Sequence, residues 1–569
     1  MLANLPATAR EFANLGWDEI KPHFDELIAR PLTDDNAAAW LADWTRLHNL
    51  IDETFQRMQV ATTLDTTDTT AEEKLIAYME NVYPHTQTAE QALKEKFLSA
   101  EIEVPGMELP LKYMQAEASI FREANIPLKT EEQKLGLEYN KTIGAQTVHF
   151  NGQDYTLSQL KPFLQGSDRA VREEVWRLSM QRYLQDRDAI NALWSKFMGL
   201  RKQIARNADL PTYRDYVWKA YLRFDYTPDD CKRFHSAIER VVVPAAARIF
   251  EKRRQKLGVP SLRPWDVDGQ APNTEPLHPF EQTEKLEALS EQMFYRLDPA
   301  LGHYMSRMRN ENLLDLSNRK GKAPGGYCTY FPVDKTPFIF MNAVGIHDDV
   351  QTLLHEAGHC FHAFESSALP YWQQTQVGLE FAEVASMSME LLAAPYLNQE
   401  NGGFYTSADA ARARVEHLEG MLVFWPYMAV VDAFQQWVYE NHDAATNPAN
   451  CDAKWLELWG RFKVGEDWSG LETEAMTGWH RKLHIHLAPL YYIEYGVAQL
   501  GAAQVWANSL KDQAGALAAY RRALALGGTV GLRELFQAAG AKLAFDADTL
   551  GKSVALIEKT IAELEGQYA

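Results

Sequence analysis

The chain has 569 residues, of which 46% are hydrophobic and 24% charged, and its net charge is −20. This composition is typical of a globular protein, and the length predicts two or more subdomains. The negative charge disfavours nucleic acid and anionic membranes as partners. The start lacks a signal-peptide pattern, no run of 18 apolar residues occurs, and the four cysteines are scattered. We therefore expect a cytoplasmic protein without a disulfide framework; its oligomeric state stays open and includes a homo-oligomer.

The first 140 residues have mainly helical spacing. Apolar residues repeat at intervals of three and four between Trp40 and Met58, which predicts a helix packed in a core. The period changes near residue 147, where TVHF, Asn151-Gly152 and QDYTL predict a short β-hairpin. Helical spacing returns from Ser167. The segment 257–283 is rich in glycine and proline and predicts the clearest seam between subdomains.

A glycine-rich stretch, GKAPGGYC, precedes a short apolar strand predicted at 337–341. Gly325 and Gly326 predict a loop that another chain can approach closely. A strand placed here could hold an extended peptide by main-chain hydrogen bonds; the alternative is a strand covered by its own sheet. The residues expected to contact such a peptide are Gly325, Gly326, Tyr327, Phe338 and Phe340.

The segment from Asp348 to Phe364 predicts a buried helix, with Asp348 as its N-cap and Gln351 three residues on. His355 and His359 are four residues apart, so a helix places both imidazoles on one side. Glu356 lies between them in the sequence. This H-E-x-x-H motif predicts two ligands for one zinc ion and a general base.

A catalytic zinc needs a third protein ligand, and several residues compete for this role. His362 is seven residues beyond His355, about 10.5 Å along a helix axis, which is a long reach for one ion. Glu365 occupies the place of the third histidine in the motif H-E-x-x-H-x-x-G-x-x-H, but that motif needs a glycine where this chain has His362. The segment GLEFAEVASMSMELL offers Glu380, Glu383 and Glu390 on an otherwise apolar helix. Buried carboxylates call for a partner. The spacing alone does not choose between Glu380 and Glu383.

The segment GWHRKLHIHLAPLYYIEYG concentrates imidazole and phenol groups. Such groups can donate hydrogen bonds to the oxyanion that forms when water attacks a carbonyl. A second metal pair at His480 and His484 lacks an intervening carboxylate, and a purely structural role for the tyrosines is the other alternative. The candidate donors are His484, His486, Tyr491, Tyr492 and Tyr495.

Together, HEAGH, FAEVAS and HIHLAPLYYIEYG resemble the M3 family of zinc metallopeptidases, in its oligoendopeptidase F branch and closest to Pz-peptidase-like members. Supporting stretches are YRDYVWKAYLRFDYTP, LRPWDVD, GKAPGGYC and LFQAAG, so the resemblance covers most of the chain from about 200 onward. It implies a mainly α, elongated, gluzincin-type fold with a deep central channel and a small β element beside the zinc helix. We expect an N-terminal helical domain at 1–200 and a catalytic domain at 201–569.

The resemblance also implies roles for individual residues. His355, His359 and Glu383 match the zinc ligands, Glu356 matches the general base, and Glu390 supports the site from outside the ligand set. The histidine that stabilises the transition state falls on His484, although His486 two residues on is a departure, and Tyr492 and Tyr495 best match the phenolic donors.

These residues predict an endopeptidase with one Zn²⁺ per chain that hydrolyses internal bonds of short peptides. An exopeptidase of the same fold, similar to a dipeptidyl carboxypeptidase, and a helical peptide-binding protein without catalysis are the alternatives.

Overall fold

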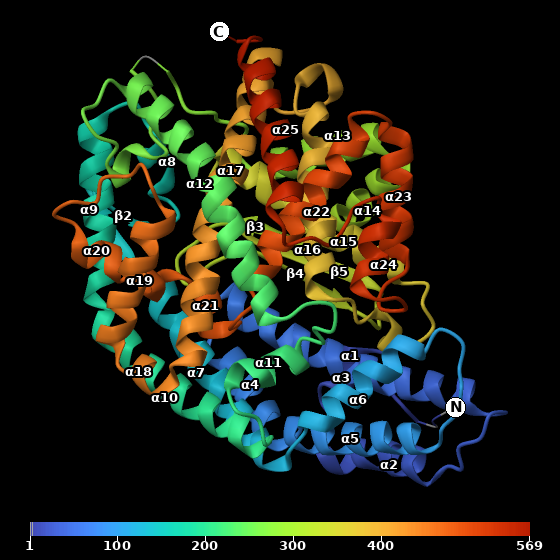
Figure 1. Ribbon diagram of the computed structural model, residues 1–569. Helices are drawn as coiled ribbons and strands as arrows, with labels where there is room; N and C mark the ends of the chain where they lie inside the picture. The colour runs from blue at the N-terminus through green and yellow to red at the C-terminus, as the bar shows by residue number, and fades with distance from the viewer. Residues whose placement is uncertain (1, 3, 273, 569) are drawn as a thin grey trace.

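The computed structural model describes residues 2, 4–272 and 274–568 and is mainly helical, as the sequence predicts (Figure 1). The N-terminal helices lie at the bottom of this view and share a hydrophobic core formed by residues between Leu2 and Met114 together with Trp372. They are α1 (Ala9–Phe12), α2 (Trp17–Ala29), α3 (Ala37–Leu64), α4 (Thr69–Asn81), α5 (Tyr83–Ser99) and α6 (Glu108–Ile120). Trp40 and Trp44 of α3 are fully buried, as their helical spacing predicts.

The next part of the chain forms the left side of the molecule in Figure 1 and part of its centre. Its elements are η1 (Glu123–Asn125), α7 (Ile126–Gly144), β1 (Thr147–Phe150), β2 (Gln153–Thr156), α8 (Lys161–Gln165), α9 (Arg169–Gln185), α10 (Arg187–Asn207), α11 (Tyr213–Ala220) and α12 (Pro228–Leu257). Strands β1 and β2 form the predicted hairpin, and Asn151 and Gly152 both have positive φ at its turn, as a type I′ turn requires.

The glycine- and proline-rich segment after α12 contains only the short helix η2 (Pro264–Asp266) among its described residues. It is anchored, because the buried carboxylate of Asp266 accepts hydrogen bonds of 2.9 Å from Arg169 on α9. The predicted domain division at residue 200 falls within α10, and the core of the N-terminal helices ends earlier, at Met114. That division stays a prediction.

A small three-stranded sheet follows α13 (Thr283–Leu297) and α14 (Pro299–Asn310). Its strands are β3 (Leu314–Ser317), β4 (Tyr327–Phe331) and β5 (Thr336–Ala343), in the order β3-β5-β4. Strand β5 is the middle strand, parallel to β3 and antiparallel to β4. Strand β4 is therefore an edge strand.

The remaining helices follow the sheet, and most of them pack into the largest hydrophobic core of the molecule. They are α15 (His347–Ser366), η3 (Trp372–Thr375), α16 (Leu379–Ala393), η4 (Ala394–Tyr396), η5 (Gln399–Asn401), α17 (Ser407–Glu440), α18 (His442–Ala445), α19 (Pro448–Phe462), α20 (Glu472–Met476), η6 (Gly478–Arg481), α21 (Leu483–Leu487), α22 (Ile493–Ser509), α23 (Gln513–Ala525), α24 (Leu532–Ala538) and α25 (Ala547–Glu565).

Helix α15 begins at His347, two residues earlier than a cap at Asp348 would allow. Its N-cap is Ile346, and the carboxylate of Asp349 accepts hydrogen bonds from the main-chain N–H groups of Val344, Gly345 and Ile346, at 2.8, 2.7 and 3.0 Å. The predicted cap at Asp348 is therefore wrong, because its neighbour satisfies the free N–H groups at this helix end.

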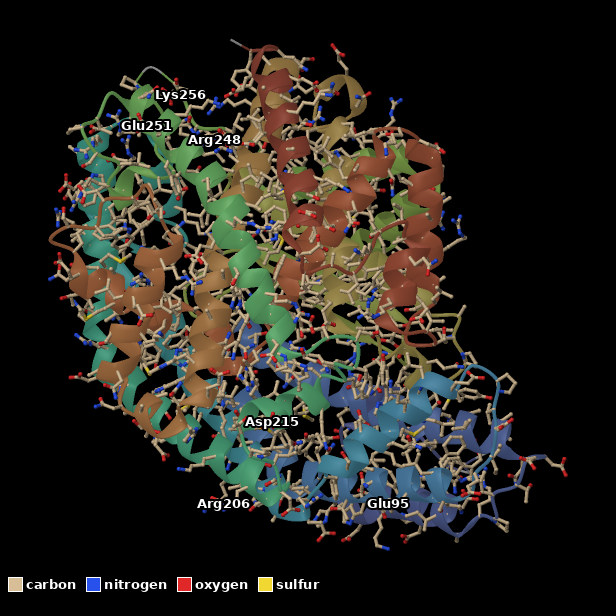
Figure 2. All side chains as sticks on the ribbon, in the orientation of Figure 1. Glu95, Arg206, Asp215, Arg248, Glu251 and Lys256 are labelled. Atoms are coloured by element: carbon tan, nitrogen blue, oxygen red, sulfur yellow. The ribbon has the colours of Figure 1, made fainter. Side chains whose placement is uncertain are left out.

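Charged side chains point outward at the periphery, for example Arg206 and Glu95 at the lower edge of Figure 2 and Glu251 and Lys256 near the end of α12. Within the residues that the structure describes, no helix is both long and apolar enough to cross a membrane.

Candidate metal centre and substrate cleft

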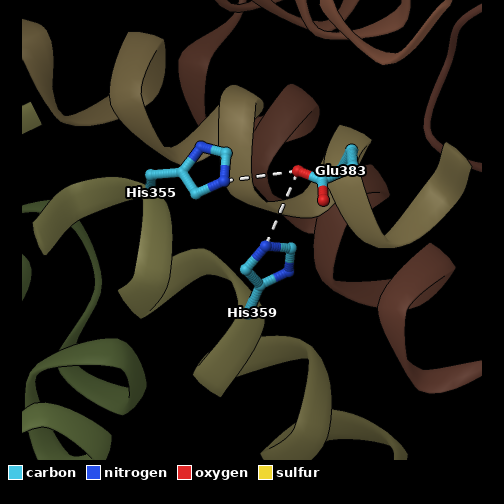
Figure 3. Close-up of side chains that lie close together, drawn as sticks. All are labelled: His355, His359 and Glu383. Atoms are coloured by element: carbon cyan, nitrogen blue, oxygen red, sulfur yellow. Dashed lines mark ion pairs between the residues drawn. The ribbon is translucent and has the colours of Figure 1, made fainter. Parts of the chain in front are cut away.

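His355 and His359 of α15 and Glu383 of α16 converge on one point (Figure 3). The Oε2 atom of Glu383 lies 3.3 Å from Nε2 of His355 and 3.6 Å from Nε2 of His359. Across the described part of the chain, this is the one group of three or more histidine, cysteine or acidic residues whose ligand atoms lie within 4.8 Å of one another. Two imidazole nitrogens and one carboxylate oxygen are a donor set that suits zinc and leaves a fourth position open.

A glycine lets the two helices meet this closely. A Cβ atom at Gly358 would lie 2.6 Å from Cα of Ser386 and 2.7 Å from the carbonyl oxygen of Ala385. The glycine of the HEAGH motif thus brings α15 against the backbone of α16, one turn beyond Glu383. This contact sets the distance between the histidines and the carboxylate.

The other candidates for third ligand have different partners. Glu380 accepts a hydrogen bond from the hydroxyl of Tyr226 and lies 3.5 Å from Nε of Arg223. Glu365 accepts a hydrogen bond of 2.7 Å from Arg521. The ring of His362 packs edge-on against Phe381, with 6.0 Å between ring centroids. Of the candidates left open by spacing, the structure brings only Glu383 to both histidines.

Two further carboxylate contacts fix the orientation of these side chains. Glu390 lies 2.7 Å from Nδ1 of His355 and 2.8 Å from Nε2 of His417 on α17. The hydroxyl of Tyr491 donates a 2.6 Å hydrogen bond to Oε1 of Glu383. Such partners hold a ligand in the tautomer and rotamer that binding needs. No pattern in the sequence points to His417, because 27 residues separate it from Glu390.

The electrostatics of the group favour a cation. Burial opposes ionisation of Glu383 and Glu390, but the neighbouring histidines outweigh it and lower the pKa of both carboxyls to about 2. Burial also lowers the pKa of His359 to about 4, so its imidazole is neutral at pH 7, as a metal ligand must be. At His355 the two carboxylates outweigh burial and raise the pKa. The position beside His355 therefore favours positive charge.

Glu356 faces the cleft without a partner for one of its oxygens. Its side chain is 6% exposed, and Oε2 is buried with no hydrogen-bond partner. Burial raises the pKa of its carboxyl to about 7, which suits a group that must take up and release a proton near neutral pH. Glu356, His355, His359 and Glu383 line a cavity of about 450 Å³.

The histidine–tyrosine segment places some of its predicted donors at this cavity and others away from it. Tyr491 and Tyr495 line the cavity, and Nε2 of His484 lies 3.1 Å from the hydroxyl of Tyr495. Burial lowers the pKa of His484 to about 3, so the ring is neutral. His486 is fully buried and stacks on Tyr139, with ring centroids 4.6 Å apart.

Tyr492 lies behind the lining of the cavity. Its ring packs against Phe424 and Tyr427, and the ammonium of Lys482 lies 4.4 Å above it. The tyrosine that contacts the candidate ligand Glu383 is Tyr491, its neighbour in the sequence. Because adjacent residues at a helix start differ in direction by about 100°, only one of the pair can face the cavity.

A buried arginine holds this segment in place. Arg223 donates a 2.8 Å hydrogen bond to the carbonyl oxygen of Leu490 and pairs with Glu494, which is fully buried. Leu490 has a φ of 65°, a left-handed conformation that a leucine adopts only when its surroundings impose it. Arg223 thus fixes the turn from which Tyr491 extends.

The glycine loop approaches Glu356. A Cβ atom at Gly326 would lie 3.5 Å from Oε1 of Glu356, and Gly326 lines the cavity. Gly325, with a φ of 91°, forms the turn before it. Tyr327 lines the cavity as well, while its ring stacks on Phe340 at 4.7 Å.

The predicted peptide contacts at Phe338 and Phe340 are wrong. Both side chains are buried in a small hydrophobic cluster with Val60 and Phe331. Their strand, β5, is hydrogen-bonded on both sides, so it has no free edge for a peptide. The open edge of the sheet belongs to β4.

The register identifies which β4 groups are free. Ile339 lies opposite Cys328, and its N–H donates to Leu313 on the far side, at 2.9 Å. Pro337 lies opposite Tyr330 and has no N–H. Main-chain groups alternate in direction along an antiparallel strand. The N–H and C=O groups of Cys328 and Tyr330 therefore point away from β5, and both residues line the cavity.

Comparisons with known proteins agree with this geometry. The model of a family described as Peptidase family M3 matches residues 163–553. The solved structure of Pz peptidase A with inhibitor 2 is 26% identical, covers 96% of this chain and 97% of its own, and superposes with a TM-score of 0.91. A putative oligoendopeptidase F is also 26% identical, with 98% of both chains covered and a TM-score of 0.91. A putative oligoendopeptidase F from Bacillus anthracis str. Ames has the same fold, at 24% identity over 96% of both chains and a TM-score of 0.85. A search of curated protein sequences gives no match.

Proposed function

Because the chain belongs to peptidase family M3, we propose that it is a zinc-dependent endopeptidase that cleaves internal bonds of short peptides. The observation that carries this proposal is the position of Glu356. Its buried carboxylate has an unpartnered oxygen and lines the same cavity as His355, His359 and Glu383. A base beside a metal-ligand set and an unpaired strand edge is an arrangement that suits metal-assisted peptide hydrolysis.

His355, His359 and Glu383 would hold the zinc ion. Their donor atoms fit it in kind and number, and the raised pKa of His355 marks a place where positive charge is favoured. When bound, zinc supplies Lewis acidity, which polarises a carbonyl and makes water a better nucleophile at neutral pH. Glu390 and Tyr491 keep His355 and Glu383 oriented for binding.

Other side chains perform the proton transfers and stabilise charge. Glu356 accepts a proton from the attacking water and later donates it to the leaving amine, for which a pKa of about 7 is well matched. Tyr495, held by His484, presents its hydroxyl group to the cavity, whereas the hydroxyl proton of Tyr491 is already donated to Glu383. Tyr495 stabilises the oxyanion that forms on the carbonyl oxygen, since its hydrogen bond strengthens as charge develops.

The main chain of β4 would hold the substrate. The free N–H and C=O groups of Cys328 and Tyr330 can pair with an extended peptide, which adds a strand to the sheet and makes few demands on side-chain identity. This role replaces the one predicted for 337–341.

The shape of the cleft supports cleavage of internal bonds. A second cavity of about 440 Å³ shares Tyr327, Cys328 and Thr329 with the central one, and a third of about 520 Å³ shares Tyr330. The three cavities therefore adjoin one another along β4, from Tyr327 to Tyr330. A peptide can extend in both directions from the scissile bond, whereas an exopeptidase needs one closed end.

A quenched fluorescent peptide assay on the wild type and Glu356→Gln tests the proposal. We expect Glu356→Gln to retain zinc, measured by elemental analysis, and to lose at least about 100-fold in kcat, since a general base contributes 10²–10⁴. Asp348→Asn is the matched control, because it removes an exposed carboxylate from the same helix. Wild-type turnover by Glu356→Gln would refute the assigned base.

Product masses from a ten-residue peptide distinguish the alternatives. Internal cleavage by the wild type supports an endopeptidase, and release of terminal residues alone would identify an exopeptidase of the same fold. Peptides that bind but stay intact in the presence of zinc would identify a binding protein.

A further inference from the structure

Two cysteines that are far apart in the sequence meet beside the candidate metal centre. The Sγ atoms of Cys328 and Cys360 lie 3.4 Å apart, although 32 residues separate them. The other two cysteines, Cys231 and Cys451, are buried and donate to main-chain carbonyls of Thr227 and Ala445. All four are free thiols.

The pair connects the two elements that the proposed activity depends on most. Cys328 belongs to β4 and lines the central cavity, so a small molecule that enters the cleft reaches its sulfur. Cys360 belongs to α15, directly follows His359 and is fully buried. One partner is therefore accessible and the other is held behind it in van der Waals contact.

The opposite face of β4 is attached to the N-terminal helices. The hydroxyl of Tyr327 lies 2.5 Å from that of Thr63, and Thr329 donates a 3.1 Å hydrogen bond to Gln56, both on α3. The strand thus lies between α3 on one side and α15 on the other. On the α15 side, the side chain of Cys328 contacts that of Cys360 without a covalent bond.

We propose that Cys328 and Cys360 form an oxidation site, at which hydrogen peroxide or an organic hydroperoxide joins β4 to α15 by a disulfide bond. The thiolate of Cys328 attacks one peroxide oxygen, which breaks the O–O bond and gives a sulfenic acid and a hydroxide ion, or an alkoxide ion from an organic hydroperoxide. This ion takes up the proton that Cys328 lost on ionising and becomes water or an alcohol. The thiol of Cys360 then attacks the sulfenic sulfur, which forms the S–S bond and breaks the S–O bond, and its proton leaves with the hydroxide as water. Each sulfur atom is oxidised by one electron, and the oxidant is reduced to two water molecules, or to one water and one alcohol.

Oxidation would change the position of the substrate-binding strand. A disulfide bond is about 2.05 Å long, so the sulfur atoms must approach by roughly 1.3 Å from their present contact. The main-chain groups of Cys328 that face the cleft move with its sulfur. A displacement of about 1 Å can lower a rate 100-fold. This consequence rests on the proposed function, whereas the disulfide itself does not.

Peptide mass mapping of the full chain tests the modification. After treatment with a small molar excess of hydrogen peroxide, we expect a mass loss of two hydrogens and a single linked peptide joining residues 328 and 360, reversed by dithiothreitol. Cys328→Ser and Cys360→Ser should each abolish the link. Cys451→Ala, which keeps the pair and removes another buried thiol, should preserve it. Sulfinic acid at Cys328 without a link, or a link between two chains, would overturn the proposal.

Peptidase activity is measured on the same samples, each variant relative to its own fully reduced rate. We expect oxidation to lower kcat/KM of the wild type and Cys451→Ala at least tenfold, with zinc content unchanged, and to leave both serine variants within twofold. A linked but fully active wild type would refute the effect on substrate binding. If the reduced chain cleaves no peptide at all, the proposed function fails, and the mapped link still decides the modification.

Discussion

Tyr491 and Tyr492 offer a direct test of how the site is built, because they are neighbours in the chain with different surroundings. The hydroxyl of Tyr491 donates a 2.6 Å hydrogen bond to Oε1 of Glu383, while the ring of Tyr492 packs against Phe424 and Tyr427. Tyr491→Phe removes one oxygen and leaves Oε1 of Glu383 without this donor, while Ser386 still donates to Oε2 at 3.1 Å. We expect weaker zinc binding from this variant and little change from Tyr492→Phe.

The expected magnitude follows from the type of hydrogen bond. A bond to a charged acceptor contributes about 1.5–3 kcal/mol, and every 1.4 kcal/mol changes an equilibrium constant tenfold. Loss of a residue that orients a ligand typically lowers metal affinity about 10–100-fold, which agrees with that range. We therefore expect the zinc Kd of Tyr491→Phe to rise about 10–100-fold.

Competition with a chromophoric chelator at pH 7.5 measures both variants under the same conditions. The pH lies well above the pKa of about 2 for Glu383 and about 4 for His359, so changes in their protonation do not contribute. A zinc Kd for Tyr491→Phe within twofold of the wild type would refute the role of this hydroxyl. A larger loss in Tyr492→Phe than in Tyr491→Phe would reverse the assignment of the two tyrosines.

Two further substitutions test the scaffold around the site. Gly358→Ala places a Cβ atom 2.6 Å from Cα of Ser386, so we expect thermal unfolding to report a loss of about 1–3 kcal/mol together with weaker zinc binding. Gly199→Ala, in helix α10 with nothing near its Cβ position, should instead stabilise by about 0.5–1 kcal/mol; equal effects would contradict the close contact. Arg223→Met leaves Glu494 buried without its partner, and urea unfolding should show a loss of about 3–5 kcal/mol. A loss below about 1 kcal/mol would show that this pair does not hold the turn.

The sequence predicts the elements of this fold because most of them have local signals. The helical spacing around Trp40 and the Asn151-Gly152 turn each depend on residues close together in the chain, and both elements form. The sequence predicts Asp348 as the cap of α15, whereas the N-cap is Ile346 and the accepting carboxylate at this helix end is that of Asp349. Asp348 and Asp349 are equally good acceptors by composition. Only the path of the preceding loop, whose N–H groups point at Asp349, decides between them.

The site also has some features that depend on residues close together in the chain and others that depend on residues far apart. The H-E-x-x-H spacing predicts that His355 and His359 share a helix face, which depends on five consecutive residues alone. The contacts of Glu383, His417 and Tyr491 join segments up to 108 residues apart, so no spacing rule contains them. The choice between Glu380 and Glu383 needed the helix crossing at Gly358, and the choice between Tyr491 and Tyr492 needed the direction in which α22 begins.

The unpaired edge of strand β4 has two opposing consequences. An unpaired strand edge is a site where other chains can add and aggregate, yet peptide binding by main-chain hydrogen bonds needs such an edge. Here β4 has five residues and lies between α3 and α15, and its residues Tyr327 to Tyr330 line the central cavity. We expect this position to admit an extended peptide and to exclude a chain with its own tertiary structure. The enclosure that prevents aggregation is therefore the same feature that restricts the proposed substrates to short, unfolded peptides, and it follows from where the N-terminal helices pack.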